Sequence, residues 1–225
     1  MYQPYHHKDI DNRFLPFPTG KVVCIGQNYA DHIAELSSIV RPEPLFFHKP
    51  NTALVSLNNE VLIPKNKGAC HNELELAVLI SKPLSKASKE QVEQAIWGYA
   101  LALDLTLREI QARLKKQGRP WEVAKSFDGA CPISAFVKKE QVVDPQNCQL
   151  RLEVDGQIRQ NGNTGQMIRP ITQLICEMTQ EFTLLPGDVV LTGTPAGVGP
   201  LKAGHRLLLT LTSGERHWQF NTEVR

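Results

Sequence analysis

The chain has 225 residues, of which 41% are hydrophobic and 21% are charged, and its formal net charge is +2. This composition predicts one ordinary globular domain and argues against a disordered chain. The 25 Lys and Arg residues almost balance the 23 Asp and Glu residues, so the concentrated basic excess of a nucleic-acid-binding protein is missing.

Membrane and secreted classes are also disfavoured. No apolar run approaches the roughly 20 residues that span a bilayer, and the polar residues 1–10 lack the hydrophobic segment of a signal peptide. The five cysteines are widely spaced and form no C-x-x-C pair, which is typical of a reducing compartment rather than a disulfide framework. We therefore expect a cytoplasmic protein with no membrane partner and no nucleic-acid partner.

The order of the predicted elements favours a β-rich chain with few helices. Apolar runs between turn residues, several of them alternating, predict strands at 21–25, 45–47, 61–63, 71–80, 99–107, 150–154, 157–159, 207–212 and 217–224. Periodic apolar positions and end signals predict helices at 29–37, 88–96, 106–117 and 170–180. Two local signals are strong: Asp155-Gly156 predicts a hairpin turn, and Ser88 with Gln91 predicts a capping box. Strands and helices do not alternate regularly, which disfavours a doubly wound parallel sheet.

An acidic cluster is the most informative motif. In a strand, residues two apart share a face, so Glu73 and Glu75 of the segment His71-Asn-Glu-Leu-Glu75 lie side by side. Asp104 is the lone charge in the alternating run 99–107. Three carboxylates are hard oxygen ligands of the kind that Mg²⁺, Mn²⁺ or Ca²⁺ prefers. The alternative is a solvent-facing Glu pair and a strand-end Asp, and spacing alone does not decide between the two.

Other candidates for chemistry are less specific. His32 and Glu35 are three residues apart on a predicted helix, where a carboxylate can orient an imidazole as a general base, although spacing alone favours an exposed pair. Lys49 and Lys125 each follow apolar residues, but most such lysines reach solvent. The segment 191–200 is rich in Gly and Thr and resembles a phosphate loop only superficially. It is either a plain loop or a turn whose amides, with the Thr194 hydroxyl, hold a carboxylate or oxyanion.

Six of these segments occur in an order that resembles the fumarylacetoacetate hydrolase family, in particular its small acylpyruvase-like branch. They are Gly26-Gln-Asn-Tyr-Ala-Asp-His32, Phe47-His-Lys-Pro50, His71-Asn-Glu-Leu-Glu75, Ala102-Leu-Asp-Leu-Thr106, Ala124-Lys-Ser-Phe-Asp128 and Leu191-Thr-Gly-Thr-Pro195. The resemblance implies an α+β fold that is predominantly β, a mixed β-sandwich or β-roll with few short helices, and a homodimer. It covers residues 21–225 as one catalytic domain, with residues 1–20 as an extension packed on it.

The resemblance also assigns roles to positions of this sequence. It places metal ligands at Glu73, Glu75 and Asp104, catalytic residues at His32, Glu35 and Lys125, and substrate contacts at Lys49, Arg108, Gln111 and Thr194. It makes the segment 28–41 a lid that closes over the substrate. One position departs from the pattern, because close relatives often have Arg where this chain has Gln27, which affects substrate choice.

The implied activity is hydrolysis of a C–C bond in acylpyruvate-type 1,3-dicarbonyl acids through a metal-stabilised enolate. The cofactor would be Mg²⁺ or Mn²⁺, with Ca²⁺ as a substitute in crystals, and the partner would be a small 2-oxo acid. The alternatives that share this centre are an oxaloacetate keto–enol tautomerase, a decarboxylase, and an isomerase of aromatic-acid breakdown. A metabolite-binding protein without catalysis is the alternative from another class.

Overall fold

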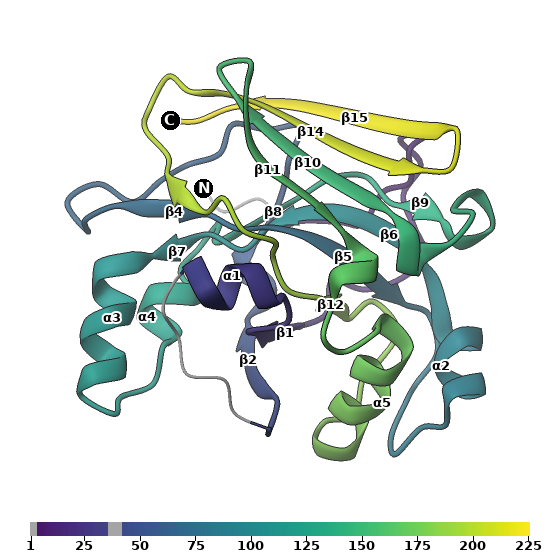
Figure 1. Ribbon diagram of the computed structural model, residues 1–225. Helices are drawn as coiled ribbons and strands as arrows, with labels where there is room; N and C mark the ends of the chain where they lie inside the picture. The colour runs from purple at the N-terminus through teal and green to yellow at the C-terminus, as the bar shows by residue number, and fades with distance from the viewer. Residues whose placement is uncertain (1–3, 36–41) are drawn as a thin grey trace.

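A computed structural model describes residues 4–35 and 42–225 of the chain. Its regular structure is mostly β, arranged in layers with short helices at the periphery (Figure 1). The large mixed sheet runs β2 (Leu45–Lys49), β1 (Val22–Gly26), β12 (Val189–Leu191), β5 (Leu74–Ile80), β6 (Ile96–Leu103), β8 (Cys131–Ile133) and β3 (Leu54–Ser56), with β9 (Val137–Lys138) paired to β6. Because β1–β12 and β3–β8 are parallel and the other pairs antiparallel, this is not a doubly wound sheet.

Two smaller sheets and five α-helices complete the described part of the chain. An antiparallel sheet, which crosses the top of Figure 1, contains β11 (Gln157–Asn163), β10 (Gln149–Val154), β14 (Arg206–Ser213) and β15 (Arg216–Glu223). A short sheet contains β13 (Gly199–Pro200), β4 (Cys70–Asn72) and β7 (Thr106–Leu107). The helices are α1 (Ala30–Glu35), α2 (Lys89–Ala95), α3 (Arg108–Lys116), α4 (Glu122–Lys125) and α5 (Ile171–Glu181). The predominantly β fold with few short helices is therefore confirmed.

Strand β5 is buried on both faces, and its alternation separates two hydrophobic cores. Leu74, Leu76, Val78 and Ile80 belong to the core that also contains the leucines of β10 and β14. Ala77 and Leu79 belong to a second core on the opposite face, with Ala100 and Ala102 of β6. The period of two therefore sorts side chains as the sequence predicts, and it directs Glu75 to the same face as Ala77.

The strongest local signals form the predicted structures. Asp155 and Gly156 both have positive φ, at 51° and 77°, as a two-residue type I′ hairpin between β10 and β11 requires. Ser88 caps α2 in a reciprocal capping box with Gln91. Helix α5 begins one residue after Pro170 and buries the predicted apolar stripe.

Several elements differ from the sequence-based expectation. The strand expected at 71–80 is interrupted at Glu73, between β4 and β5, and the strand expected at 99–107 is interrupted at residues 104–105, between β6 and β7. The strand expected at 61–63 is reduced to a single bridge between Val61 and Val224. The helix expected from residue 106 begins at Arg108, because β7 pairs with β4 first. Asn28 does not cap α1; its side chain bonds the backbone of Arg169 and Thr192.

The lid expected at 28–41 includes residues 36–41, which lie outside the described residues. From the first 20 positions, Tyr5, Leu15 and Phe17 pack against the second core, while the domain boundary at residue 20 stays a prediction. No helix in the described ranges is long and apolar enough to cross a membrane.

Candidate active site

Three carboxylates meet at one end of the β5–β6 pair. Glu73 lies between β4 and β5, Glu75 is in β5, and Asp104 follows the last residue of β6. The antiparallel register places Leu74 opposite Leu103, and the Asp104 amide donates to the Glu73 carbonyl at 2.8 Å. One oxygen of each carboxylate therefore lies within 4.8 Å of the others, and all three side chains are buried. The three carboxylates thus lie close together, as the sequence predicts, and their role as metal ligands stays a prediction.

Three cations surround these carboxylates. The Lys125 ammonium lies 2.8 Å from Glu73 Oε2 and 2.7 Å from Asp104 Oδ2. Lys49 Nζ lies 2.8 Å from Asp104 Oδ1, and Arg108 donates to Glu73 Oε1. A buried carboxylate needs such partners, because an unpaired charge in the interior is costly.

The cations act unequally on the carboxylates. Burial works to raise the pKa of Glu73, but the charges of Lys125 and Arg108 outweigh burial and hold that pKa well below its ordinary value. Burial and then the nearby charges of Asp104 and Glu73 raise the pKa of Glu75 well above its ordinary value. The Glu73 and Asp104 carboxylates in turn raise the pKa of Lys125, although burial opposes them.

The donor set fits a hard divalent cation. Three carboxylates, one in β5 and two directly beside β5 and β6, offer oxygen atoms only, and those atoms converge on one point. A divalent charge at that point would relieve the repulsion that raises the pKa of Glu75. The set contains no thiolate or imidazole, so it does not match the ligands typical of zinc.

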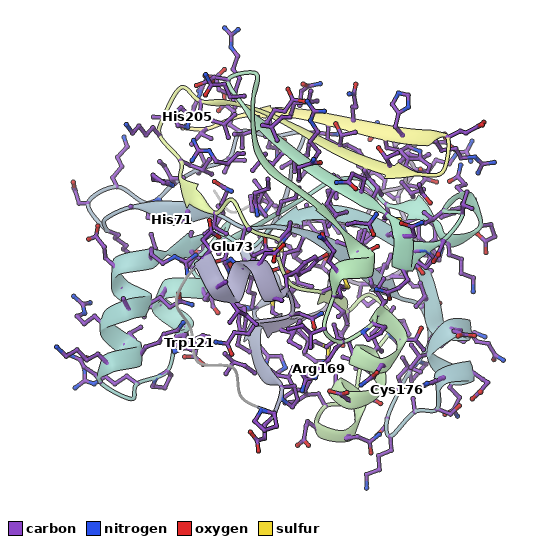
Figure 2. The ribbon with its side chains drawn as sticks, viewed as in Figure 1. His71, Glu73, Trp121, Arg169, Cys176 and His205 are labelled. Carbon is purple, nitrogen blue, oxygen red and sulfur yellow. The ribbon has the colours of Figure 1, made fainter. Side chains whose placement is uncertain are left out.

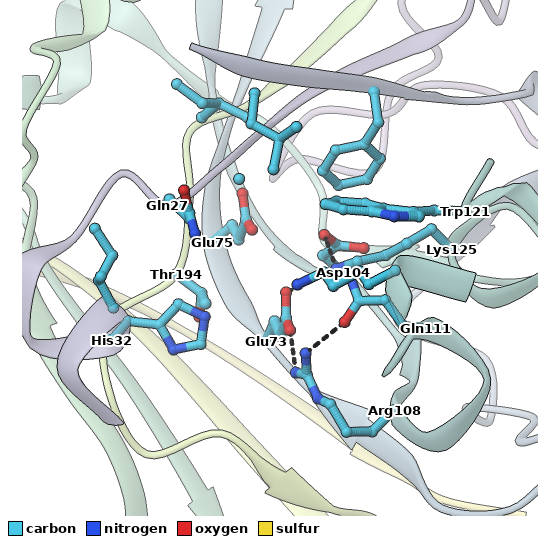
Figure 3. Close-up of a pocket in the computed structure, with 16 residues that line it drawn as sticks. Gln27, His32, Glu73, Glu75, Asp104, Arg108, Gln111, Trp121, Lys125 and Thr194 are labelled. Carbon is cyan, nitrogen blue, oxygen red and sulfur yellow. Dashed lines mark hydrogen bonds and ion pairs between the residues drawn. The ribbon is translucent and has the colours of Figure 1, made fainter. Parts of the chain in front are cut away.

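A histidine–glutamate pair faces this cluster from α1. His32 Nδ1 lies 3.2 Å from Glu35 Oε2, and the imidazole is buried. The Gly197 amide donates to both Glu35 oxygens, at 3.1 and 3.3 Å, so the carboxylate is held from the other side. Figure 3 shows His32 across the pocket from Glu73. His32 is thus buried, whereas Glu35 is exposed, so the alternative of an exposed helical pair describes only one of the two residues.

The loop Thr192–Gly197, which follows β12, supplies backbone donors to the site. The Gly193 amide donates to Glu75 Oε2 at 2.6 Å, and Gly197 holds Glu35 as described. The segment is therefore more than a plain loop, because two of its amides hold carboxylates of the protein itself. Binding of a substrate carboxylate or oxyanion at this turn stays a prediction. The Thr194 hydroxyl donates to the Leu74 carbonyl at 2.8 Å, so its hydrogen is already engaged.

One pocket brings most of the predicted residues together. Figure 2 shows Glu73 close to α1, and the pocket between them is lined by His32, Glu73, Glu75, Asp104, Arg108, Gln111, Lys125 and Thr194. Gln27 lines it as well, with a positive φ of 62°. Arg108 also donates to Gln111 Oε1 at 2.8 Å, which orients the amide at the pocket wall.

One predicted residue does not line the pocket, and one residue that was not predicted does. Lys49, a predicted substrate contact, is fully buried beneath Asp104 and is not among the pocket-lining residues. Trp121 lines the pocket and packs against Phe47, with ring centroids 6.1 Å apart. Sequence reasoning missed Trp121, because an isolated aromatic residue in a polar stretch carries no motif; only the α3–α4 connection brings it to the site.

Comparisons with known proteins agree with the geometry. The family model "Fumarylacetoacetate (FAA) hydrolase C-terminal" matches residues 21–218. Oxaloacetate tautomerase YcgM of Escherichia coli (strain K12) is 51% identical over 92% of this chain and 94% of its own length. The solved structure of a Yersinia pestis CO92 protein described as belonging to that hydrolase family is 51% identical and has a TM-score of 0.95, covering 98% of this chain and all of the other.

A further solved structure bears on the chemistry. Fumarylpyruvate hydrolase from Pseudomonas aeruginosa, in complex with Mn²⁺ and pyruvate, is 34% identical and has a TM-score of 0.89. The alignment covers 98% of this chain and 95% of that one. Both tautomerase and hydrolase activities are therefore represented among proteins with this fold, and the more similar of the two is the tautomerase.

Proposed function

This chain is a member of the fumarylacetoacetate hydrolase family of enzymes, and from that premise we propose that it is an Mg²⁺- or Mn²⁺-dependent oxaloacetate keto–enol tautomerase. The observation that carries the proposal is the acid triad and the His32–Glu35 pair in one pocket of a chain 51% identical to an oxaloacetate tautomerase. Hydrolysis, which the sequence resemblance placed first, becomes the second candidate.

The buried charges prepare the pocket for an anionic 2-oxo acid. A divalent cation held by Glu73, Glu75 and Asp104 would supply Lewis acidity that makes the C–H bond beside a 2-oxo group more acidic. Arg108, at the pocket wall, presents a guanidinium suited to a substrate carboxylate. Lys125 keeps its proton, because the pKa of its ammonium is raised, and so offers a donor to developing negative charge on oxygen.

The histidine–glutamate pair performs the proton transfer. Glu35 accepts the Nδ1 hydrogen of His32, and in that tautomer of the neutral imidazole Nε2 is the nitrogen that can act as a base. His32 would take a proton from carbon 3 of the keto form, and a proton would be delivered to the 2-oxo oxygen to give the enol. General base catalysis of this kind contributes about 10²–10⁴-fold to a rate.

The second candidate, hydrolysis of acylpyruvates, uses the same pair to activate water instead. It is supported by the fumarylpyruvate hydrolase whose structure contains Mn²⁺ and pyruvate. Because the two reactions share the base and the triad, only a comparison of rates on one protein sample separates them.

The test compares oxaloacetate tautomerisation with acetylpyruvate cleavage, using protein loaded with Mg²⁺ or Mn²⁺. We expect faster turnover of oxaloacetate, and loss of that activity when a chelator removes the metal. His32→Ala should lower tautomerisation by about 10²-fold or more and abolish cleavage, whereas Asp31→Ala, an exposed change on the same helix, should not. Tautomerisation at the wild-type rate in His32→Ala, or activity that survives the chelator, would contradict the mechanism.

Two further expectations belong to this proposal. A cytoplasmic location is supported by the five cysteines, all of which are free thiols. A homodimer is implied by the family resemblance, and light scattering of the purified protein would give twice the chain mass of 25.2 kDa. A mass of one chain would contradict the dimer and leave the catalytic proposal unaffected.

A further inference from the structure

Gln160 is a buried amide that makes four hydrogen bonds, and of its partners only Thr194 lines the pocket. Its Oε1 accepts from Asn72 Nδ2 and from the Leu74 amide, both at 2.8 Å. Its Nε2 donates to Thr194 Oγ1 at 2.8 Å and to the Pro195 carbonyl at 2.9 Å. Both donors and both acceptor positions of the side-chain amide are thus used, which is the most that a Gln side chain can make.

These bonds join two segments that carry the candidate active site. Asn72 and Leu74 flank Glu73 in the acidic segment, and Leu74 precedes Glu75. Thr194 and Pro195 stand in the middle of the Thr192–Gly197 loop. That loop holds Glu75 through the Gly193 amide and Glu35 through the Gly197 amide. One side chain from the four-stranded sheet therefore connects the acid triad with the loop that orients the histidine–glutamate pair.

A β-bulge in β11 directs Gln160 into this position. Leu152 pairs with Gln160, but the next residue, Glu153, pairs with Ile158, so Arg159 is the extra residue. Simple alternation would place Ile158 and Gln160 on one face. The bulge instead exposes Ile158 by 56% and buries Gln160 to 1%. Exposing an apolar residue while burying an amide does not favour stability, and bulges often re-aim a side chain beside an active site.

Close backbone packing supports the same connection. A Cβ atom at Gly162 would lie 2.3 Å from Pro195 Cβ, and a Cβ atom at Gly197 would lie 1.9 Å from the Arg159 carbonyl oxygen. Only glycine fits at these two positions, so the Thr192–Gly197 loop lies directly against β11 on both sides of Gln160. The loop is therefore fixed to the second sheet, and Gln160 is the polar link between them.

From these contacts we propose that Gln160 is a positioning residue for catalysis, which sets the Glu75 and Glu35 carboxylates through the Thr192–Gly197 loop. The inference rests on the proposed function, because it takes the triad as the metal site and His32–Glu35 as the base. Gln160 itself touches neither metal nor substrate; it acts through Leu74, Thr194 and Pro195. Its loss removes four of the hydrogen bonds that set the loop against the acidic segment, while the direct bonds of Thr192 and Thr194 to that segment remain. We expect the loop to shift rather than detach, which changes metal affinity and proton transfer together.

The test uses Gln160→Met, which keeps the approximate size of the side chain and removes all four hydrogen bonds. Asn161→Ala is the matched control, because Asn161 is the exposed neighbour on the same strand and bonds only Gln149 in the described structure. Mn²⁺ is titrated into substrate-free protein by calorimetry, and kcat and KM for oxaloacetate are then measured at saturating Mn²⁺. Circular dichroism confirms that each variant is folded.

We expect Gln160→Met to weaken Mn²⁺ binding by about 10–100-fold, the usual effect of removing a residue that supports metal ligands. At saturating Mn²⁺, kcat should fall more than KM rises, because the base and not the substrate contact is displaced. Asn161→Ala should match wild type in both measurements. A folded Gln160→Met protein with wild-type Mn²⁺ affinity and wild-type kcat would overturn the inference, even if its melting temperature fell.

If Gln160→Met does not fold, a second variant tests the positioning role of Gln160. Thr194→Val keeps the side-chain shape and removes only the hydroxyl, which accepts from Gln160 and donates to the Leu74 carbonyl. Weaker Mn²⁺ binding in this variant supports the inference, and unchanged binding refutes it. Wild-type protein that binds no Mn²⁺ would instead refute the metal-dependent function, and the inference would fall with it.

Discussion

Replacing Lys49 tests how the buried charges hold the candidate active site together. Lys49 is fully buried, and its ammonium lies 2.8 Å from Asp104 Oδ1. It also donates to the Lys125 carbonyl and, at 3.5 Å, to the Leu105 carbonyl. Lys49→Met keeps the length of the side chain and removes the charge and these hydrogen bonds together.

The expected loss follows from the geometry. At 2.8 Å and an effective dielectric constant of about 20, the attraction between the two charges is about 6 kcal/mol. The variant no longer buries an ammonium group, which offsets part of that loss, and Asp104 keeps its contact with Lys125. Removing one partner of a buried pair typically costs about 3–5 kcal/mol, and we expect a value in this range. For a chain of this size, that lowers the melting temperature by about 6–20 °C.

Urea unfolding of wild type and variant, followed by circular dichroism, measures the change in the free energy of unfolding. The control is Lys139→Met, because Lys139 is only half-buried and its side chain donates only to the Glu93 carbonyl in the described structure. Lys49→Met combined with Asp104→Asn removes both charges, so its loss should be smaller than the sum of the two single losses. A Lys49→Met loss no larger than the control's, or strictly additive losses, would refute the account of Lys49 as the buried partner of Asp104.

Three other predictions follow from single features of the structure. Burial lowers the pKa of His7 to about 4 from 6.5, so the neutral imidazole contributes fully to the free energy of unfolding above pH 6.5. That contribution is lost as the pH falls, and at pH 4 about 3 kcal/mol is gone. Urea unfolding of His7→Gln should therefore show a weaker pH dependence than that of wild type. Gly197→Ala should cost at least about 2 kcal/mol and most of the tautomerase activity, since φ is 97° and the added Cβ meets Arg159. The control is Gly204→Ala, where φ is 90° but the space is open, and equal losses in both would contradict the packing argument. Mn²⁺ at about 100 times its dissociation constant should stabilise wild type by about 2.7 kcal/mol in a thermal scan; the same stabilisation of Glu75→Gln would contradict a ligand role for Glu75.

Much of the framework is predictable from the sequence, because it depends on short-range periodicity. The alternation in 74–80 sorts side chains between two cores, and Asp155-Gly156 closes a hairpin whatever surrounds it. The acidic triad is predictable for a similar reason, since Glu73 and Glu75 are two residues apart where β5 begins and Asp104 directly follows β6. The helix ends at Ser88 and Pro170 likewise follow from local chemistry.

The rest depends on which distant segments meet, and short-range spacing contains no information about that. Lys49 looks like any lysine at a strand end, and only the β1–β2 pairing and the buried Asp104 make it an internal counterion. Gln160 stands in a strand whose alternation would place it with Ile158, until the bulge at Arg159 separates them. A one-residue irregularity reverses the face of every side chain beyond it, and this one is stabilised by contacts with the Thr192–Gly197 loop, more than thirty positions further along the chain.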